Sequence, residues 1–452
     1  MPRSIHKGCN DFRQTSAATR DRWLGDGLTR RQALLGAFGG GLTIWANQAM
    51  PWARVLEAAS AQAADAPGAR VLVSVFLPGG CDLLDTLPPI GAYGQYADLR
   101  GGMKLEAPPA LGATGLGIHP SLAEGTNGGV KGLFEAGKIG FLPGIDYANP
   151  DLSHFHSRHF WETGLITERA APGWLGRWLD RHGAKDNPLQ GLTLGYTLSP
   201  VLATGSAPVA ALESPNDVAL NVWGIGGQQE RQMLAAWQRM ADAGAAARGD
   251  GPQAVHTAAE LAKAVGDRLA PYAEHDDVDP LAPPVPYPEE DDLGRRLSRV
   301  AALVAQPLGV RLAAVDANGD FDTHDDQPGE LADSLRSVSQ SLSAFQADLE
   351  ARGIADRVLT LVWSEFGRRP AGNESSGTDH GAGGVAWVQG THAASGILTE
   401  YPSLTDLDRD DNLKVTVDFR KVYASLIEGW LGTDANEVIP NANAYGRLAL
   451  VR

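Results

Sequence analysis

The segment at residues 319–326 reads GDFDTHDD and carries residue types that bind metal ions. Because alternate residues of an extended chain face the same side, Asp322 and His324 can share one cation. A carboxylate beside an imidazole suits zinc, manganese or iron better than calcium. The alternating acids also resemble a calcium loop, but Phe321 stands where an EF-hand needs glycine. An acidic turn with a hydrogen-bonded histidine explains the segment equally well.

Two further polar segments follow the apolar run at residues 358–363. Glu365 comes directly after this run and would project into a crevice at the end of a strand. Arg368, two residues after Phe366, could hold an anion through its forked N–H donors. An ion-paired loop is the alternative, and this segment alone favours it. Asp379 and His380 follow in a Gly-rich stretch that lets the backbone approach a ligand closely.

Three histidines stand within residues 153–159, which read SHFHSRH. Ser153 suits the N-cap of a helix, and at that positive helix end it could also act as a nucleophile or contact an anion. His156 could share its face of the helix, and Arg158 could clamp the anion. Capping and stacking are the simpler interpretation of this segment.

A fourth polar segment, GGCD, follows the apolar run that ends at Leu77. Asp82 in this segment is either a metal ligand or the cap of a turn, and its position favours the cap. Cys81 does not begin a C-x-P-S-R motif, so conversion to formylglycine is not indicated.

The surrounding elements predict an α/β fold. Residues 309–315 and 358–363 read as buried strands, and between them an apolar stripe at steps of three and four residues predicts a helix. Strand, helix and strand then form a crossover unit of a parallel sheet, whose carboxyl-end loops carry the polar segments. Further strands are expected at 69–77, 138–143 and 191–204, and helices at 153–163, 174–182, 228–247, 254–272 and 292–305, with an acidic Pro-rich loop at 276–292.

Composition limits the classes of function. The chain has 452 residues and a formal net charge of −16, which argues against nucleic-acid binding because phosphate contacts need an excess of Lys and Arg. After the first fifty residues no apolar run is long enough to cross a bilayer, so an integral membrane protein is not expected.

Residues 1–63 have the order of an export signal. Arg30 and Arg31 precede a Gly-rich apolar stretch, and Ala61-Gln62-Ala63 offers a cleavage site. The paired arginines resemble a twin-arginine signal, which predicts a periplasmic protein exported in the folded state by the twin-arginine translocase. A frayed amphipathic helix is the alternative. The remainder, residues 64–452, is expected to be a single α/β domain that needs no internal disulfide, because only one cysteine remains.

Taken together, the motifs resemble the exported bacterial family DUF1501 over about residues 70–431. The resemblance rests on VFLPGGCD, the SHF…FWETG run, GWLGRWLD, FDTH, WSEFGRR, TDHG and VDFRKVYASLIEGWLG. That family is similar to the alkaline phosphatase/sulfatase superfamily, which implies a three-layer α/β/α sandwich with a mostly parallel sheet. It also implies a nucleophile near Ser153 and metal ligands near Asp322, His324 and His380.

The chain departs from the superfamily pattern at several ligand positions. Glu365 replaces an Asp, Phe366 replaces a ligand His, and Asp82 comes later than the usual metal Asp. The resemblance therefore implies one divalent metal, Zn, Mn or Ca, rather than two. The full set of expected metal ligands is Asp82, Asp322, His324, Glu365, Asp379 and His380.

Two functions are compatible with these residues. The first is a metal-dependent hydrolase of phosphate or sulfate esters, with Ser153 attacking or contacting the oxyanion and with His156, Arg158 or Arg368 binding the anion. The second is a catalytically silent binding or assembly component of the envelope. Members of the family often accompany another exported family, DUF1800, so the resemblance implies a partner of that kind.

Overall fold

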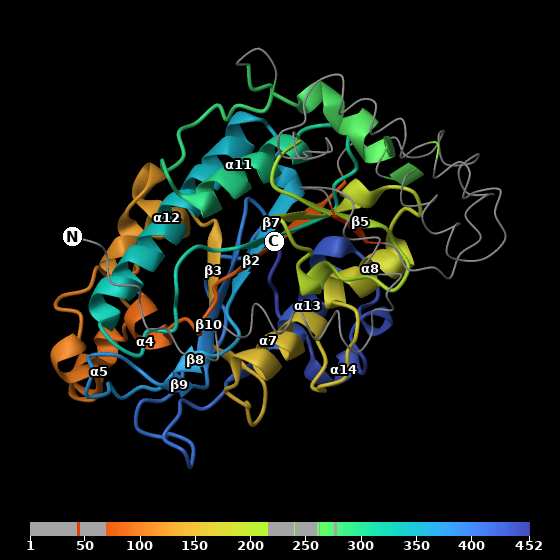
Figure 1. Ribbon diagram of the computed structural model, residues 1–452. Helices are drawn as coiled ribbons and strands as arrows, with labels where there is room; N and C mark the ends of the chain where they lie inside the picture. The colour runs from red at the N-terminus through yellow and green to blue at the C-terminus, as the bar shows by residue number, and fades with distance from the viewer. Residues whose placement is uncertain (1–42, 46–68, 216–238, 240–259, 262, 275–277) are drawn as a thin grey trace.

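A computed structural model describes residues 43–45, 69–215, 239, 260–261, 263–274 and 278–452 (Figure 1). It shows a mixed α/β fold built on one large, mostly parallel sheet. The ten-stranded sheet has the order β1-β5-β4-β6-β2-β7-β10-β3-β11, and β12 also pairs with β3. The strands are β1 (Thr43–Trp45), β2 (Val71–Phe76), β3 (Ile139–Asp146), β4 (Gly191–Leu194), β5 (Val209–Leu212), β6 (Leu312–Asp316), β7 (Val358–Trp363), β10 (Gly384–Gln389), β11 (Gly396–Ile397) and β12 (Val417–Asp418).

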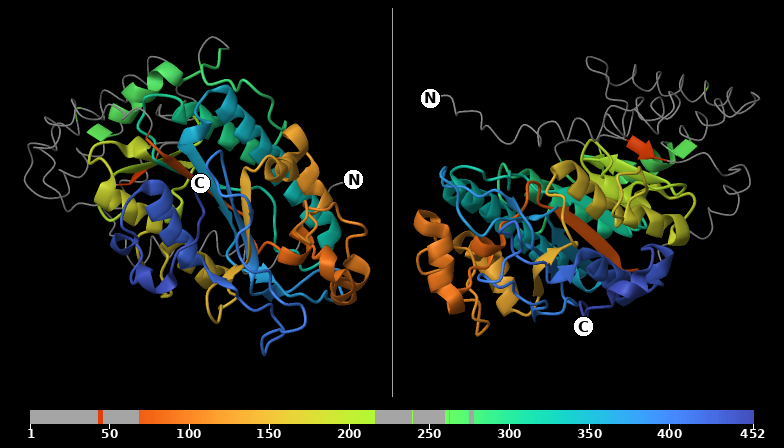
Figure 2. Two further views of the ribbon diagram at one scale, coloured as in Figure 1. Left: turned by 180° about the vertical axis from the view of Figure 1, so that it is seen from behind. Right: turned by 90° about the horizontal axis from the view of Figure 1, so that it is seen from below.

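Strand β2 shows why the sheet is buried on both faces. Successive side chains of a strand point to opposite sides, so Val73 and Val75 enter one apolar cluster while Leu72 and Phe76 enter the other. Helices therefore cover both faces, as parallel strands require. Figures 1 and 2 show α11 and α12 on one side of the sheet and α7, α8 and α13 on the other.

Several of the helices follow from amphipathic patterns in the sequence. The main ones are α5 (Tyr93–Arg100), α6 (Gly129–Glu135), α7 (His154–Thr163), α8 (Trp174–His182), α11 (Asp292–Val304), α12 (Gln327–Ala351) and α13 (Phe419–Leu426), with the short helices α4 (Leu83–Thr86) and α14 (Ala442–Tyr445). Leu331, Leu335 and Val338 of α12 are buried in the same cluster as Val73. The predicted apolar stripe thus faces the sheet, as its spacing requires.

The predicted crossover unit is present, with one difference. Strands β6 and β7 are both parallel to β2, which lies between them in the sheet. Helix α12 therefore connects strands two positions apart rather than neighbours. The antiparallel strand β10, which pairs with both β7 and β3, was not predicted. Its near-continuous apolar run, GVAWVQ, gives no sign of strand direction.

The predicted signal region is mostly outside the described residues. Arg30, Arg31 and the proposed cleavage site at Ala63 lie there, as does the helix expected at 228–247 except for residue 239. The helix expected at 254–272 is described at 260–261 and 263–272, and residues 260–261 and 263–269 are helical. Within residues 1–63 the structure describes β1, which pairs antiparallel with β5 at the edge of the sheet. A strand in this part of the chain was not predicted from the sequence.

Within the described ranges, no helix combines the length and the apolar character needed to span a bilayer.

Candidate metal centre

Three parallel strands deliver the polar loops to one edge of the sheet. Phe76, the last residue of β2, is paired with Asp316 of β6 and with Trp363 of β7. The three strands therefore end at the same level, and the loops that follow them emerge side by side. Gly79 lets two of these loops touch: its φ is +113°, and a Cβ there would lie 2.3 Å from the backbone nitrogen of Asp322.

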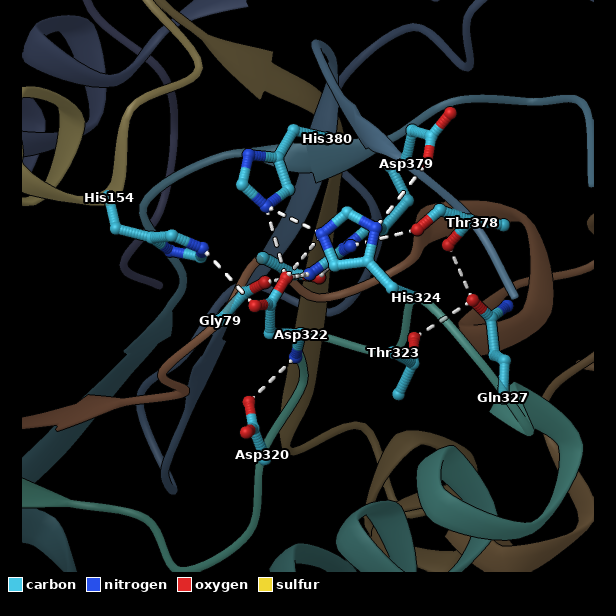
Figure 3. Close-up of polar contacts among 12 residues, drawn as sticks. Gly79, His154, Asp320, Asp322, Thr323, His324, Gln327, Thr378, Asp379 and His380 are labelled. Atoms are coloured by element: carbon cyan, nitrogen blue, oxygen red, sulfur yellow. Dashed lines mark hydrogen bonds and ion pairs between the residues drawn. The ribbon is translucent and has the colours of Figure 1, made fainter. Parts of the chain in front are cut away.

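Three side chains from distant parts of the chain converge at these loops (Figure 3). His154, Asp322 and His380 each offer one ligand atom, and these atoms lie within 4.8 Å of one another. His154 is the first residue of α7, Asp322 lies in the loop after β6, and His380 begins the two-residue strand β9 (His380–Gly381), which pairs with β8 (Gly367–Arg368). Two imidazoles and a carboxylate form a donor set suited to a divalent transition metal.

A backbone carbonyl fixes the orientation of the His380 ring. His380 Nδ1 donates to the carbonyl oxygen of Leu152 at 2.9 Å, so in the neutral ring Nε2 carries the lone pair. Burial lowers the pKa of His380, which favours that neutral form. The carbonyl group of Leu152 owes its orientation to an uncommon backbone conformation, because Leu152 has a φ of +60°.

A buried glutamate orients the second imidazole. His154 Nδ1 lies 2.8 Å from Glu365 Oε1, and that carboxylate also accepts hydrogen bonds from the backbone nitrogens of Gly79 and Gly80. Burial alone would lower the pKa of His154, but Asp322 and Glu365 outweigh it and raise the value to about 9. A cation bound here would therefore displace a proton from His154.

Asp322 is the negative centre of the cluster. Its Oδ1 accepts from Arg368 at 2.5 Å and lies 3.0 Å from His380 Nε2. Burial would raise the pKa of Asp322, but the neighbouring histidines and Arg368 hold it well below its usual range. The other oxygen, Oδ2, is buried and accepts no hydrogen bond within the described part of the chain, although His154 Nε2 lies 3.5 Å away. A buried carboxylate oxygen in this state fits a site for a cation.

His324 stands at the rim of the cluster. Its Nε2 lies 3.1 Å from His380 Nε2 and 3.1 Å from Asp322 Oδ1, and its Nδ1 lies 3.4 Å from Asp379 Oδ1. The His324 side chain is 35% exposed, whereas that of His154 is 1% exposed. His324 is thus the most exposed histidine of this group, since the His380 side chain is 18% exposed.

The structure separates the expected metal residues into three groups. Asp322, His324 and His380 come together, as the spacing and the resemblance predicted. Glu365 and Asp379 lie one step outward and contact His154 and His324. Asp82 lies apart in a cap: it accepts from the backbone nitrogen of Leu84 and pairs with Arg100 at 2.6 Å.

The arginines expected to bind an anion are occupied by the protein itself. Arg368 is buried, and it donates to the carbonyl oxygens of Gly79, Gly80 and Thr378 as well as to Asp322. The ion-paired loop was therefore the better interpretation of Arg368.

The expected anion-binding residues of α7 have partners as well. Arg158 pairs with Glu162 at 2.7 Å and with Asp316 at 3.1 Å, and His156 Nδ1 lies 2.8 Å from Asp151. Ser153 holds the N-cap position of α7, but its hydroxyl makes no capping hydrogen bond.

Sequence reasoning did not select His154, although it singled out the segment that contains it. Helical spacing directed attention to Ser153 and His156, while the ligand is the first helical residue between them. Glu365 could have pointed to His154. A buried glutamate needs a positively charged or hydrogen-bond-donating partner, and a histidine can be that partner.

One family model matches the part of the chain that carries the cluster. Residues 148–439 match the family model described as "Protein of unknown function (DUF1501)", a span that includes His154, Asp322 and His380. No curated protein matches the chain. Because the match covers well over half of the sequence, the chain belongs to the DUF1501 family.

Proposed function

We propose that the protein is a metal-dependent hydrolase of phosphate or sulfate esters with a single metal site. The observation that carries the proposal is the convergence of His154, Asp322 and His380, each held by a partner outside the cluster. Histidine ligands of catalytic metals commonly donate their second ring nitrogen to a carboxylate or a carbonyl. Glu365 and the carbonyl of Leu152 are placed to accept these two bonds.

Three protein ligands leave a coordination position of the metal open for water or substrate. Catalytic zinc sites usually have three protein ligands and one open position, whereas structural sites have four. A divalent ion held there would act as a Lewis acid, lowering the pKa of a water molecule and neutralising charge on an anionic ester. Asp322 supplies the negative charge that retains the cation, and Zn²⁺ or Mn²⁺ suits the two imidazoles better than Ca²⁺.

We assign His324 the role of general base. Its ring is partly exposed, and its Nδ1 faces the carboxylate of Asp379 at 3.4 Å, which favours the tautomer with a proton on Nδ1. The lone pair of Nε2 would then face the cluster, 3.1 Å from His380 Nε2 and from Asp322 Oδ1, where it would accept a proton from an attacking water. Ser153 would contact the ester oxyanion at the positive end of α7, because its hydroxyl is not used for capping.

The remaining parts of the proposal come from the family resemblance. They are an alkaline-phosphatase-like three-layer sandwich and a DUF1800-type exported partner. The helices on both faces of the mostly parallel sheet support the first of these. Export by the twin-arginine route to the periplasm is proposed separately, from the residue order of 1–63.

One observation favours the silent binding or assembly function instead. Arg158 and Arg368, the arginines nearest the cluster on α7 and β8, are already neutralised by Glu162, Asp316 and Asp322. An anionic substrate would then depend on the metal and Ser153 for its binding.

Turnover of simple esters tests the two functions. Protein exported by its native route is loaded with Zn²⁺ or Mn²⁺ and assayed on p-nitrophenyl phosphate and p-nitrophenyl sulfate. We expect turnover that a chelator abolishes, that His324→Ala lowers at unchanged metal content, and that Ser153→Ala lowers chiefly through a higher KM. Metal-loaded protein that turns over neither ester nor a wider ester panel would reject the hydrolase and favour the binding function.

A further inference from the structure

A buried amide connects the loops that carry two of the proposed ligands. Gln327 is the first residue of α12 and is fully buried. Its Oε1 accepts hydrogen bonds from the hydroxyls of Thr323 at 2.9 Å and Thr378 at 2.5 Å. Figure 3 shows this amide below the histidine cluster, between the two threonines.

The two threonines are adjacent in the chain to the ligands. Thr323 directly follows Asp322, and Thr378 stands two residues before His380. The loops also touch through their backbones, because the nitrogen of Thr378 donates to the carbonyl of Thr323 at 2.9 Å. The backbone nitrogen of Gln327 itself donates to Ser376 at 2.9 Å, so one residue holds the second loop by both its main chain and its side chain.

Two carboxylates fix which way the amide points. Gln327 Nε2 donates to Asp82 Oδ2 at 2.6 Å and to Asp85 Oδ2 at 2.7 Å. An ionised carboxylate only accepts hydrogen bonds, so the amide nitrogen must face the acids and the amide oxygen must face the threonines. Arg100 in turn holds Asp82 at 2.6 Å, and the hydroxyl of Tyr96 holds Asp85 at 2.8 Å.

We propose that Gln327 is a positioning residue, which sets the separation of Asp322 and His380 by clamping Thr323 and Thr378. The inference rests on the proposed metal site and adds to it a residue that touches neither the metal nor a substrate. The inference also assigns Asp82 a role other than metal binding. Asp82 orients the Gln327 amide, and this amide in turn positions the two ligand loops.

The expected loss of metal affinity on removing the Gln327 amide can be estimated from residues that hydrogen-bond to metal ligands in other proteins. Removal of a hydrogen-bond partner behind a metal ligand typically costs 10–100-fold in affinity. Gln327 acts one bond further out, through threonines next to the ligands, so we expect a loss of about tenfold, the lower end of that range.

The test compares Gln327→Met with a matched control on the same helix. Gln346 is also a buried glutamine of α12, and its Nε2 donates to Glu350 at 2.6 Å, away from the ligand loops. Zn²⁺ affinity is measured by competition with a chromophoric chelator, and the visible spectrum of the Co²⁺-loaded protein reports the ligand geometry. We expect Gln327→Met to bind Zn²⁺ about tenfold more weakly with an altered Co²⁺ spectrum. Gln346→Met should match wild type in both measurements.

A second variant keeps the test decisive if Gln327→Met does not fold. Thr378→Val removes one of the two clamped hydroxyls at nearly constant volume, and it should weaken Zn²⁺ binding by severalfold. Wild-type affinity and an unchanged Co²⁺ spectrum in the folded variants would overturn this inference alone. A wild-type protein that binds no Zn²⁺ would overturn the proposed metal site and the inference together.

Discussion

Two buried acidic clusters lie at the same edge of the sheet, and they use their carboxylates differently. In the first, Asp82 and Asp85 surround Arg100, and every carboxylate oxygen has a hydrogen-bond donor. In the second, Asp322 faces histidine nitrogens, and its Oδ2 accepts no hydrogen bond from any described residue. We infer that carboxylates whose oxygens all have donors mark a structural cluster, while an open carboxylate among imidazoles marks a site for a cation.

The largest effect that separates the two clusters should be on stability. Arg100→Met would leave two carboxylates buried without their charge partner, and breaking a buried pair in this way costs about 3–5 kcal/mol. Arg336→Met is the matched control, because Arg336 pairs with Glu124 and Asp333 at the surface and should cost no more than about 1 kcal/mol. Denaturant unfolding measures both. Similar losses in the free energy of unfolding for the two variants would contradict a structural role for the first cluster.

The second effect concerns metal affinity rather than stability. Glu365→Gln removes the charge that orients His154, and such changes typically weaken metal binding 10–100-fold. Glu162→Gln provides the control, since Glu162 is equally buried but bonds Arg158 instead of a histidine ligand. Chelator competition with Zn²⁺ should separate the two variants. If both variants bind Zn²⁺ with wild-type affinity, Glu365 does not support metal binding through His154.

A third effect is a dependence of stability on pH that belongs to the first cluster. Burial raises the pKa of Asp85 to about 6 despite the opposing charge of Arg100. The folded state then binds more protons than the unfolded state between about pH 4 and pH 6, so stability falls as the pH rises through that window. Asp85→Asn should remove this part of the pH dependence, as unfolding curves at pH 4 and pH 7 would show. An Asp85→Asn profile parallel to wild type would contradict the assignment.

The smallest effect is an expected lack of reactivity. Cys81 lies beside both clusters, and burial raises the pKa of its thiol to about 12. Because the thiolate is the reactive form, Cys81 in the native protein at pH 8 should resist iodoacetamide, while Cys81 in the denatured protein should react at once. Rapid labelling of Cys81 in the native protein, located by peptide mass spectrometry, would show that this part of the core opens readily.

The sequence predicted the central elements well because their patterns are local. The apolar run at residues 358–363 and the stripe of α12 depend only on neighbours along the chain, and both appear where expected. The order β6-β2-β7 could not be predicted in the same way, since it depends on which strand occupies the middle of the sheet. The antiparallel direction of β10 likewise depends on pairing with distant strands.

For the site, residue types were easier to predict than partners. Asp322, His324 and His380 were expected and do come together. Arg368 was assigned to an anion because its sequence does not reveal the carbonyl groups of Gly79 and Gly80 that it binds. His154 was passed over because its partners Glu365 and Asp322 lie more than 150 residues away in the chain. Contacts between distant segments thus decided which polar residues became ligands.

Calorimetric titration of Zn²⁺ into metal-free protein tests the central claim most directly. Wild type should bind one equivalent, and His154→Ala, Asp322→Asn and His380→Ala should each lose most of that affinity while remaining folded. An absence of binding to wild type, or binding that survives all three substitutions unchanged, would contradict the assignment of these residues to a metal centre.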